Sequence, residues 1–323
     1  MQEEAKGFVS VIGAGAWGTT LANLLAEKGR PVRLWVYEEE LCREMEEARE
    51  NRLYLPGILL HSGISFTNEL KEAAEAEVLV SVAPTHAVRG IWERLSPHLV
   101  SSRPLIVSAS KGLEEGSLMT MTQVIGETLG RLRPELKPRG LGCISGPNFA
   151  PELSRKLPSA AVAASSADDS AREIQTLFST PYYRLYTQRD VLGAELGGAL
   201  KNVIAIASGI SDGLSLGDNA RAALLVRGMA EISRLGACLG AEVRTFSGLA
   251  GFGDLVLTCC GNLSRNRRVG LKIGQGERLD EILGGMREVA EGVFTTRAAV
   301  KLAERVGVEL PICREVEAIL FDR

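Results

Sequence analysis

Residues 8–18, FVSVIGAGAWG, join a β-branched apolar run to three glycines, Gly13, Gly15 and Gly18, in the pattern G-x-G-x-x-G. The motif follows an expected strand and opens an expected helix over residues 16–28, which is the context in which it binds a dinucleotide. Gly13 permits a tight turn, Gly15 lets the backbone approach a pyrophosphate, and Gly18 allows the helix and strand to pack closely. The free N–H groups of the helix start then face the anion. We therefore predict a dinucleotide-binding βαβ unit here.

The alternation of short β-branched runs and longer helical stretches continues to about residue 186. Apolar runs that are hydrophobic at successive positions indicate strands buried on both faces, as in a parallel sheet. Beyond residue 190 the strand signal disappears, and apolar residues recur at spacings of three and four. We predict an α/β fold with a Rossmann-like, mostly parallel, doubly wound sheet over residues 1–188 and an all-α, substrate-binding domain over residues 189–323. Further strands are expected at residues 32–36, 78–82, 104–108, 140–145, 159–164 and 182–186.

Composition argues against several classes of protein. The chain has 40 acidic and 37 basic residues, so it has no overall positive field that would hold nucleic acid. The acidic N-terminal residues do not resemble a signal peptide, and no apolar run reaches the roughly 20 residues of a membrane span. The six cysteines show no CxxC pair or zinc-ligand spacing. We expect a cytoplasmic protein with reduced thiols, no bound metal and no integral membrane segment.

The end of the second expected strand bears on cofactor choice. A Rossmann fold reads the adenosine ribose at this point, and here the sequence has Tyr37 and Glu38 with no adjacent arginine. A carboxylate there repels a 2′-phosphate. The sequence therefore favours NAD over NADP.

Hydride transfer at an alcohol carbon also needs a group that exchanges the hydroxyl proton. The chain has three histidines, of which His86 is placed to approach the cofactor and His98 is expected at the surface. Lys201 is the alternative, because it is a single cation in the apolar, glycine-rich segment LGAELGGALKNVIAIASGI, and burial would lower its pKa. A lysine that snorkels to the helix surface fits that pattern equally well.

Two further candidates lie in loops. Lys111 follows an expected strand, at the carboxyl edge of the sheet where ligands of open α/β folds bind. Asp254 lies in GLAGFGDL, where glycines allow tight folding that would bring a carboxylate near other groups. An ordinary loop lysine and an ordinary turn aspartate explain the same residues.

Six segments occur in the order GAGAWGTTLA, ASKGLE, ISGPNFA, GGALKNVIAI, AGFGDLVLTC and SRNRR. Together they resemble the bacterial-type NAD(P)-dependent glycerol-3-phosphate dehydrogenases over nearly the whole chain. The resemblance implies an enzyme that reversibly reduces dihydroxyacetone phosphate, a small phosphate ester, to sn-glycerol 3-phosphate with NAD(P)H. It further implies a cytoplasmic role in supplying glycerophospholipid synthesis, and it is compatible with a homodimer.

The resemblance also implies roles for individual residues. Lys201 matches the proton acceptor, Asp254 would hold it in position, and Lys111 would help to bind the substrate. Arg265 of SRNRR would grip the substrate phosphate, for which its planar fork is suited, whereas Arg267 and Arg268 receive no role. The other implied substrate contacts are Gly146, Asn148, Ser264 and Asn266. Besides the fingerprint glycines, the implied cofactor contacts are Ala16, Trp17, Tyr37, Lys111, Ala150, Arg265, Val289 and Glu291.

Two departures from the family pattern affect these roles. Asn148 stands where relatives often have serine or threonine, and Tyr37–Glu38 replaces a stretch that is basic in some members. Two other classes of protein share part of the pattern. A dehydrogenase of 3-hydroxy acids or ketopantoate also combines a Rossmann half, a helical half and a lysine, but a carboxylate substrate does not explain SRNRR. A dinucleotide-sensing regulator need not keep Lys201, Asp254 and Arg265 together.

Overall fold

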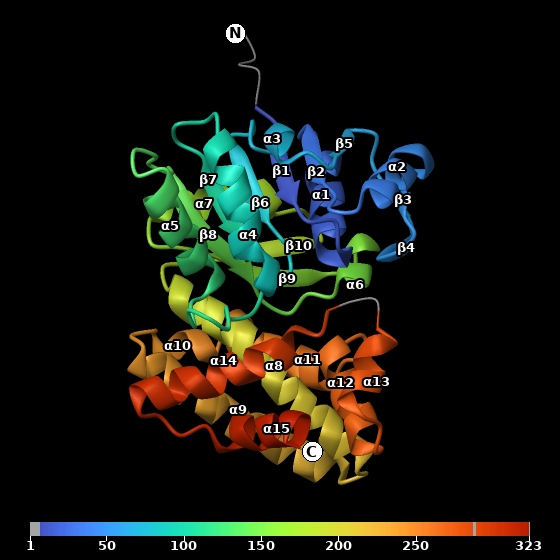
Figure 1. Cartoon of the computed structure of the whole chain (residues 1–323), viewed down its shortest axis with the longest axis vertical. Coiled ribbons are helices and arrows are strands. Elements are labelled where there is room, and N and C mark those ends of the chain that lie inside the picture. Colours follow the sequence, from blue (N-terminus) through green and yellow to red (C-terminus); the bar gives the residue numbers. More distant parts are fainter. Residues whose placement is uncertain (1–6, 287–288, 323) are drawn as a thin grey trace. The chain divides into compact units, whose positions relative to one another are not determined.

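The computed structural model describes residues 7–286 and 289–322 (Figure 1). It divides into two compact units. The first, which we call the strand unit, comprises residues 1–110, 122–144 and 148–189. The second, which we call the helical unit, comprises residues 190–323 together with two short segments, 111–121 and 145–147. The chain therefore passes into the helical unit twice before it reaches the long helical C-terminal half.

An eight-stranded sheet forms the centre of the strand unit, with the order β10-β9-β8-β7-β6-β1-β2-β5. The strand pairs whose registers are defined, such as β1 with β2 and β1 with β6, are parallel. The fold-class prediction of a mostly parallel sheet is thus confirmed. The strands are β1 (Val9–Ile12), β2 (Val32–Trp35), β5 (Ile64–Thr67), β6 (Val78–Ser81), β7 (Leu105–Ser108), β8 (Gly140–Ser145), β9 (Ser159–Ser165) and β10 (Tyr183–Gln188).

Helices cover this sheet, which explains why its central strands read as continuous apolar runs. All four residues of β1 and all four of β7 are buried. The expected helix over residues 16–28 is α1 (Ala16–Glu27), which follows the fingerprint glycines directly. The other helices of this part of the chain are α2 (Glu39–Ala48), α3 (Leu70–Ala73), α4 (Thr85–Leu95), the 3₁₀ turn η1 (Ser96–His98), α5 (Met121–Leu132), α6 (Ala150–Ser154) and α7 (Asp168–Phe178).

The strand order reverses at β1, which has β2 on one side and β6 on the other. In open α/β sheets the ligand crevice lies at such a reversal, outside the carboxyl ends of the strands. The loop GAGAWG leaves β1 at this point. Topology and sequence motif therefore indicate the same place on the strand unit.

Three short strands were not expected from the sequence. The strands β3 (Glu50–Asn51) and β4 (Leu55–Leu59) form a separate two-stranded antiparallel sheet, and β5 adds an edge to the main sheet. The strand β3 has two residues, and β4 contains Pro56 and Gly57, which sequence rules count against a strand. The strand β5 has four residues, of which only the first and the last are buried, so it gives no continuous apolar run.

The helical unit is built around α8 (Val191–Gly213), and from residue 191 onward the described residues contain helices and no strand. The helix α8 is apolar and long enough to cross a membrane, but 83% of its most apolar window is buried, so it is the core helix of this unit. The other helices are α9 (Gly217–Cys238), α10 (Val243–Phe246), the π-helix η2 (Leu249–Gly253), α11 (Asp254–Cys260), α12 (Arg265–Gly274), α13 (Leu279–Gly284), α14 (Glu291–Val306) and α15 (Pro311–Phe321). The predicted all-α C-terminal region is confirmed.

Candidate active site

The fingerprint loop of the strand unit has the geometry that a dinucleotide requires. Gly13 has φ +117°, a left-handed conformation that side chains other than glycine rarely adopt. A Cβ atom on Gly18 would lie 1.9 Å from the Gly13 carbonyl oxygen, whereas one on Gly15 would meet no atom within 4 Å. Gly15 therefore faces open space that a side chain would fill, as expected if the pyrophosphate binds there.

The start of α1 supports the same assignment. The first turn, which includes Ala16 and Trp17, contains no acidic residue, and no side chain caps it. Its N–H groups and the helix dipole therefore favour an anion. The indole Nε1 of Trp17 is buried and has no hydrogen-bond partner in the described residues. These features fit a bound NAD(P).

Asn51 of β3, which the sequence analysis missed, binds the fingerprint loop from outside it. It is fully buried, and its amide nitrogen donates to the Ala14 carbonyl oxygen and to Thr19 Oγ1, both at 2.8 Å. Its amide oxygen accepts a hydrogen bond from the Tyr54 N–H at 3.0 Å. Asn51 thereby ties the separate β3–β4 sheet to the fingerprint loop. The contacts span more than 30 residues of sequence, so no local pattern could reveal them.

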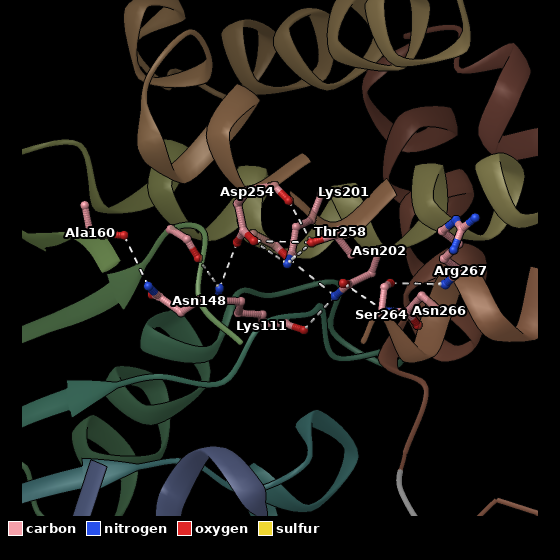
Figure 2. Close-up of polar contacts among 12 residues, drawn as sticks. Lys111, Asn148, Ala160, Lys201, Asn202, Asp254, Thr258, Ser264, Asn266 and Arg267 are labelled. Atoms are coloured by element: carbon pink, nitrogen blue, oxygen red, sulfur yellow. Dashed lines mark hydrogen bonds and ion pairs between the residues drawn. The ribbon is translucent and has the colours of Figure 1, made fainter. Parts of the chain in front are cut away.

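Three other predicted cofactor or substrate contacts lie in the strand unit. Tyr37 follows β2 and is 71% exposed, and next to it the Glu38 carboxylate accepts a hydrogen bond from the Tyr54 hydroxyl at 3.0 Å. Ala150 is the first residue of α6. The Asn148 amide nitrogen donates to the Ala160 carbonyl oxygen at 3.2 Å (Figure 2). The Asn148 amide oxygen accepts from the Tyr183 hydroxyl at 3.1 Å. The Asn148 side chain thus ties its loop to β9 and β10.

His86 and His98 both belong to the strand unit. His86 is the second residue of α4, and its side chain is exposed at the carboxyl end of β6. His98 is exposed in the 3₁₀ turn, as predicted. Both histidine side chains are exposed, whereas Lys201 is only 7% exposed.

In the helical unit, Lys201 is buried in the middle of α8, so the snorkelling interpretation is wrong. Its ammonium donates to Asp254 Oδ1 at 2.6 Å and to Thr258 Oγ1 at 2.7 Å. The Thr258 hydroxyl in turn donates to the Asp254 carbonyl oxygen at 2.7 Å. Thr258 lies four residues after Asp254 on α11 and therefore on the same helix face. That spacing was the signal in the sequence that we did not use.

Lys111 forms a hydrogen bond with the other carboxylate oxygen of Asp254. Its ammonium donates to Asp254 Oδ2 at 2.7 Å and to the Gly146 carbonyl oxygen at 2.8 Å. Figure 2 shows both lysine side chains converging on Asp254. Each ammonium has two hydrogen-bond partners among the residues that the structure describes, so one of its three protons remains for a ligand. With both lysines charged, the cluster has a net charge of about +1, which suits an anionic ligand or a developing alkoxide.

Small residues in α8 make this convergence sterically possible. A Cβ atom on Gly197 would lie 2.5 Å from the Ala250 carbonyl oxygen of η2, and one on Gly198 would lie 2.8 Å from Ser145 Oγ. The two glycines of GGALK therefore let the segment before Asp254, and the segment that contains Gly146, pack against α8 one turn before Lys201. The π-helix itself is of a kind often found at functional sites.

Burial and the neighbouring charges set the protonation of Lys201. Loss of hydration lowers the pKa of Lys201 to about 8, with the charge of Lys111 acting in the same direction and Asp254 opposing it. A base for neutral pH needs a pKa near the operating pH. Lys201 has this property without a histidine.

A chain of buried amides links the rest of the predicted site. The Asn202 amide donates to the Lys111 carbonyl oxygen at 3.3 Å, and its oxygen accepts from the Asn266 amide at 2.9 Å. The Asn266 oxygen accepts from the Gly292 N–H at 2.9 Å, next to Glu291 at the start of α14. This series of hydrogen bonds thus connects the Lys111 loop, α8, α12 and α14. Asn202, which the sequence analysis missed, directly follows Lys201.

The SRNRR segment forms the start of α12. Ser264 is the N-cap, and its hydroxyl accepts from the Arg267 N–H at 3.2 Å. Arg265 is half-buried at the first helical position, where the helix start favours an anion. Val289 and Glu291 are half-buried around the start of α14. The helical unit therefore brings Lys111, Gly146, Lys201 and Asp254 together by direct hydrogen bonds, and Asn266 is linked to them through Asn202. Ser264 and Glu291 lie next to this network in sequence, at the starts of α12 and α14.

Comparison with known proteins agrees with this geometry. Residues 8–171 match the family model for the NAD-dependent glycerol-3-phosphate dehydrogenase N-terminus, and residues 190–323 match the model for its C-terminus. A glycerol-3-phosphate dehydrogenase [NAD(P)+] of Geobacter metallireducens is 54% identical over 315 residues, which cover 97% of this chain and 92% of that protein. The crystal structure of glycerol-3-phosphate dehydrogenase from Coxiella burnetii is 37% identical, with a TM-score of 0.92 over 98% of this chain and 95% of that one.

A more distant match concerns one of the rival interpretations. A ketopantoate reductase structure from Ralstonia eutropha covers 97% of this chain and 96% of that one, with 15% identity and a TM-score of 0.61. At that identity the similarity shows a shared fold alone.

Proposed function

Since this chain belongs to the NAD-dependent glycerol-3-phosphate dehydrogenases, we propose that it interconverts dihydroxyacetone phosphate and sn-glycerol 3-phosphate with Lys201 as the proton-exchanging group. The observation that carries the proposal is the pairing of a buried Lys201 with Asp254 and Thr258, at 2.6 and 2.7 Å. Residues 1–188 act as the dinucleotide-binding domain and residues 189–323 as the substrate-binding domain, to which Lys111 and Gly146 are added.

In the oxidation of glycerol 3-phosphate, the C2 hydroxyl gives its proton to the neutral Lys201 amine as the C2–H bond releases hydride. NAD(P)+ supplies the hydride acceptor when it is bound. Asp254 fixes the Lys201 nitrogen and offsets its positive charge, while Lys111 contributes positive potential toward the oxygen. In the reverse direction Lys201 returns the proton to the alkoxide. Arg265, with Ser264 and Asn266, holds the phosphate, and Gly146 and Asn148 complete the substrate contacts.

The cofactor contacts we propose are the fingerprint residues Gly13, Gly15, Ala16, Trp17 and Gly18, with Tyr37, Lys111, Ala150, Arg265, Val289 and Glu291. We propose NAD as the preferred form, because the Glu38 carboxylate is held beside Tyr37 by the Tyr54 hydroxyl and would repel a 2′-phosphate. Changing Tyr37→Arg and Glu38→Arg together should raise kcat/KM for NADPH relative to NADH. An unchanged ratio would mean that these side chains point away from the ribose.

The primary experiment is a steady-state assay at 340 nm with dihydroxyacetone phosphate, first with NADH and then with NADPH. Dihydroxyacetone and ketopantoate serve as controls that lack the phosphate or replace it with a carboxylate. Turnover with the phosphate ester alone supports the proposal. Turnover with ketopantoate would favour a 2-keto acid reductase, and no turnover with any of the three would favour a dinucleotide sensor.

Two variants test the residue assignments. Lys201→Ala should lower kcat by roughly 100-fold or more while NADH still binds, as measured by the fluorescence of the bound nucleotide. Arg265→Ala should mainly raise the KM for dihydroxyacetone phosphate. Unchanged turnover in Lys201→Ala would rule out Lys201 as the base.

The wider setting follows from the same function. We propose a cytoplasmic enzyme whose product supplies glycerophospholipid synthesis.

We also propose a homodimer, because the helical unit exposes Leu214, Leu216 and Val226 by 55, 59 and 63% along the end of α8 and the first half of α9. Light scattering coupled to size exclusion should give twice the mass of 34.6 kDa, and the mass of a single chain would contradict the dimer.

A further inference from the structure

One arginine of SRNRR has an environment unlike that of a ligand-binding side chain. The Arg267 guanidinium contacts Asp212 Oδ2 through Nε at 2.8 Å and through a terminal nitrogen at 2.7 Å. Its other terminal nitrogen donates to Asn262 Oδ1 at 3.1 Å. The side chains of Arg267 and Asp212 are only 16% and 12% exposed. The Arg267 charge is therefore already paired within the protein.

A second arginine forms an ion pair with the other carboxylate oxygen of Asp212. Arg221 of α9 donates to Asp212 Oδ1 at 2.8 Å and also contacts Asp218. The two arginines and two aspartates sum to zero charge, so this cluster does not itself attract an anion. It joins three helices, because Asp212 lies in the last turn of α8, Arg221 belongs to α9 and Arg267 lies in the first turn of α12.

Helix geometry connects this cluster to the substrate residues. Residues two positions apart on an α-helix point to nearly opposite sides, so anchoring Arg267 at the end of α8 directs Arg265 to the other side of α12. Figure 2 shows the Arg267 side chain directed away from Asn266, whose amide meets Asn202 of α8. The first turn of α12 is thus fixed to α8 at two points, Asn266–Asn202 and Arg267–Asp212.

We infer that Arg267 is a positioning residue, which through its ion pair with Asp212 sets the rotation of the α12 start and thereby aims Arg265 at a phosphate dianion. The inference rests on the proposed function, since it assigns Arg265 to the substrate phosphate. It gives the two arginines different tasks. Arg265 binds the ligand, and Arg267 holds the helix that presents it.

A double-mutant cycle with Arg265→Ala tests this inference. Arg267→Ala alone should raise the KM for dihydroxyacetone phosphate roughly tenfold, the effect expected of coupled neighbours. In the Arg265→Ala background it should change that KM little, because the side chain it positions is already gone. Additive effects of the two substitutions would instead make Arg267 a direct phosphate ligand and overturn the inference.

Two further measurements distinguish positioning from general stabilisation. In Arg267→Ala, kcat at saturating dihydroxyacetone phosphate should stay close to the wild-type value while the KM for this substrate rises. A fall in kcat together with loss of the native circular-dichroism spectrum would show a loss of fold and would overturn the positioning role. Asp212→Asn should reproduce the KM effect, and Arg267→Lys should give an intermediate value, because lysine keeps the charge without the two-nitrogen contact. Arg314→Ala, at the exposed ion pair with Glu304, is the matched control and should be neutral.

The proposed function and this inference can fail separately. The cycle is repeated with glycerol 3-phosphate binding measured by calorimetry in the absence of cofactor, which does not depend on turnover. A wild-type protein that binds glycerol 3-phosphate but does not reduce dihydroxyacetone phosphate would contradict the proposed function and leave the cycle decisive. A wild-type enzyme that works, with Arg267→Ala indistinguishable from it, would overturn the positioning role alone. A wild-type protein that neither binds nor reacts would overturn both.

Discussion

At the scale of single residues, the proposed chemistry depends on Asp254, whose two carboxylate oxygens bind different lysines. Oδ1 accepts from Lys201 and Oδ2 accepts from Lys111, so one buried carboxylate fixes both ammonium groups. The carboxylate opposes the effect of burial on the Lys201 pKa, while Lys111 adds to it. Asp254 therefore controls both the position and the protonation of the proposed base.

A pH profile tests this directly. With a pKa of about 8, the neutral form of Lys201 grows as pH rises, so kcat for glycerol 3-phosphate oxidation should increase through about pH 8 and then level off. The reduction needs the protonated form, and its kcat should fall over the same interval. Measuring kcat in both directions between pH 6 and about pH 10 checks the assignment. Profiles that are flat near pH 8 would contradict it.

Asp254→Asn provides the control for that profile. The substitution removes the charge that raises the pKa of Lys201. The rise of kcat for glycerol 3-phosphate oxidation should therefore move to lower pH, while the maximal kcat falls. If this rise of kcat moved to higher pH instead, a group other than Lys201 would be the one that titrates.

The sequence was informative about single residues where one pattern carried the signal. The isolated lysine in an apolar, glycine-rich segment indicated Lys201, and the structure confirms its burial. Asn51 and Asn202 could not be found in the same way, because asparagine is common in loops and helices. Their roles arise from partners such as Ala14 and Lys111, which are distant in sequence.

At the scale of elements, the pairing of α8 with α12 depends on close approach of the two backbones. A Cβ atom on Gly270 would lie 2.0 Å from the Ile206 carbonyl oxygen, and one on Gly209 would lie 2.1 Å from the Arg267 carbonyl oxygen. These contacts are with backbone atoms, which cannot rotate away as a flexible side chain could. The two helices that present Lys201 and Arg265 are therefore held at a fixed separation.

Gly270→Ala should for this reason destabilise the protein by about 1–3 kcal/mol, as overpacking does, and it should raise the KM for dihydroxyacetone phosphate. Gly130→Ala is the matched control, because Gly130 lies within α5 and its Cβ would meet no atom within 4 Å. That change should stabilise the helix by about 0.5–1 kcal/mol. Chemical denaturation of the two variants measures both effects, and equal stabilities would contradict the close packing.

Long helices and strands that are buried along their length were predictable, whereas strands without a continuous buried apolar run were not. The expected helix over residues 16–28 corresponds to α1, and the expected strands after residue 78 correspond to β6–β10 within one or two residues at each end. The strand β3 has two residues, and β4 contains a proline and a glycine. The strand β5 is as long as β1, but only its first and last residues are buried, so it gives no continuous apolar run. Their pairing partners alone define them.

At the scale of the whole molecule, the helical unit is not a continuous piece of chain. Residues 111–121 and 145–147 belong to it, although they lie between strands of the other unit. They supply Lys111, which reaches Asp254 at 2.7 Å, and the Gly146 carbonyl oxygen, which Lys111 contacts at 2.8 Å. Local sequence patterns could not reveal this interleaving, because it depends on contacts across more than 100 residues.

A dissection experiment follows from the interleaving. A fragment of residues 190–323 keeps Lys201 and Asp254 but loses Lys111 and the segment that packs on Gly198 of α8. One oxygen of the buried carboxylate then lacks its partner, at a cost of several kcal/mol, and apolar surface of α8 becomes exposed. We expect the fragment to unfold at a lower denaturant concentration than the helical part of the intact chain. Hydrogen exchange of α8 amides in the fragment and in the full chain measures the difference, and equal protection would show that the two inserted segments are dispensable for the helical unit.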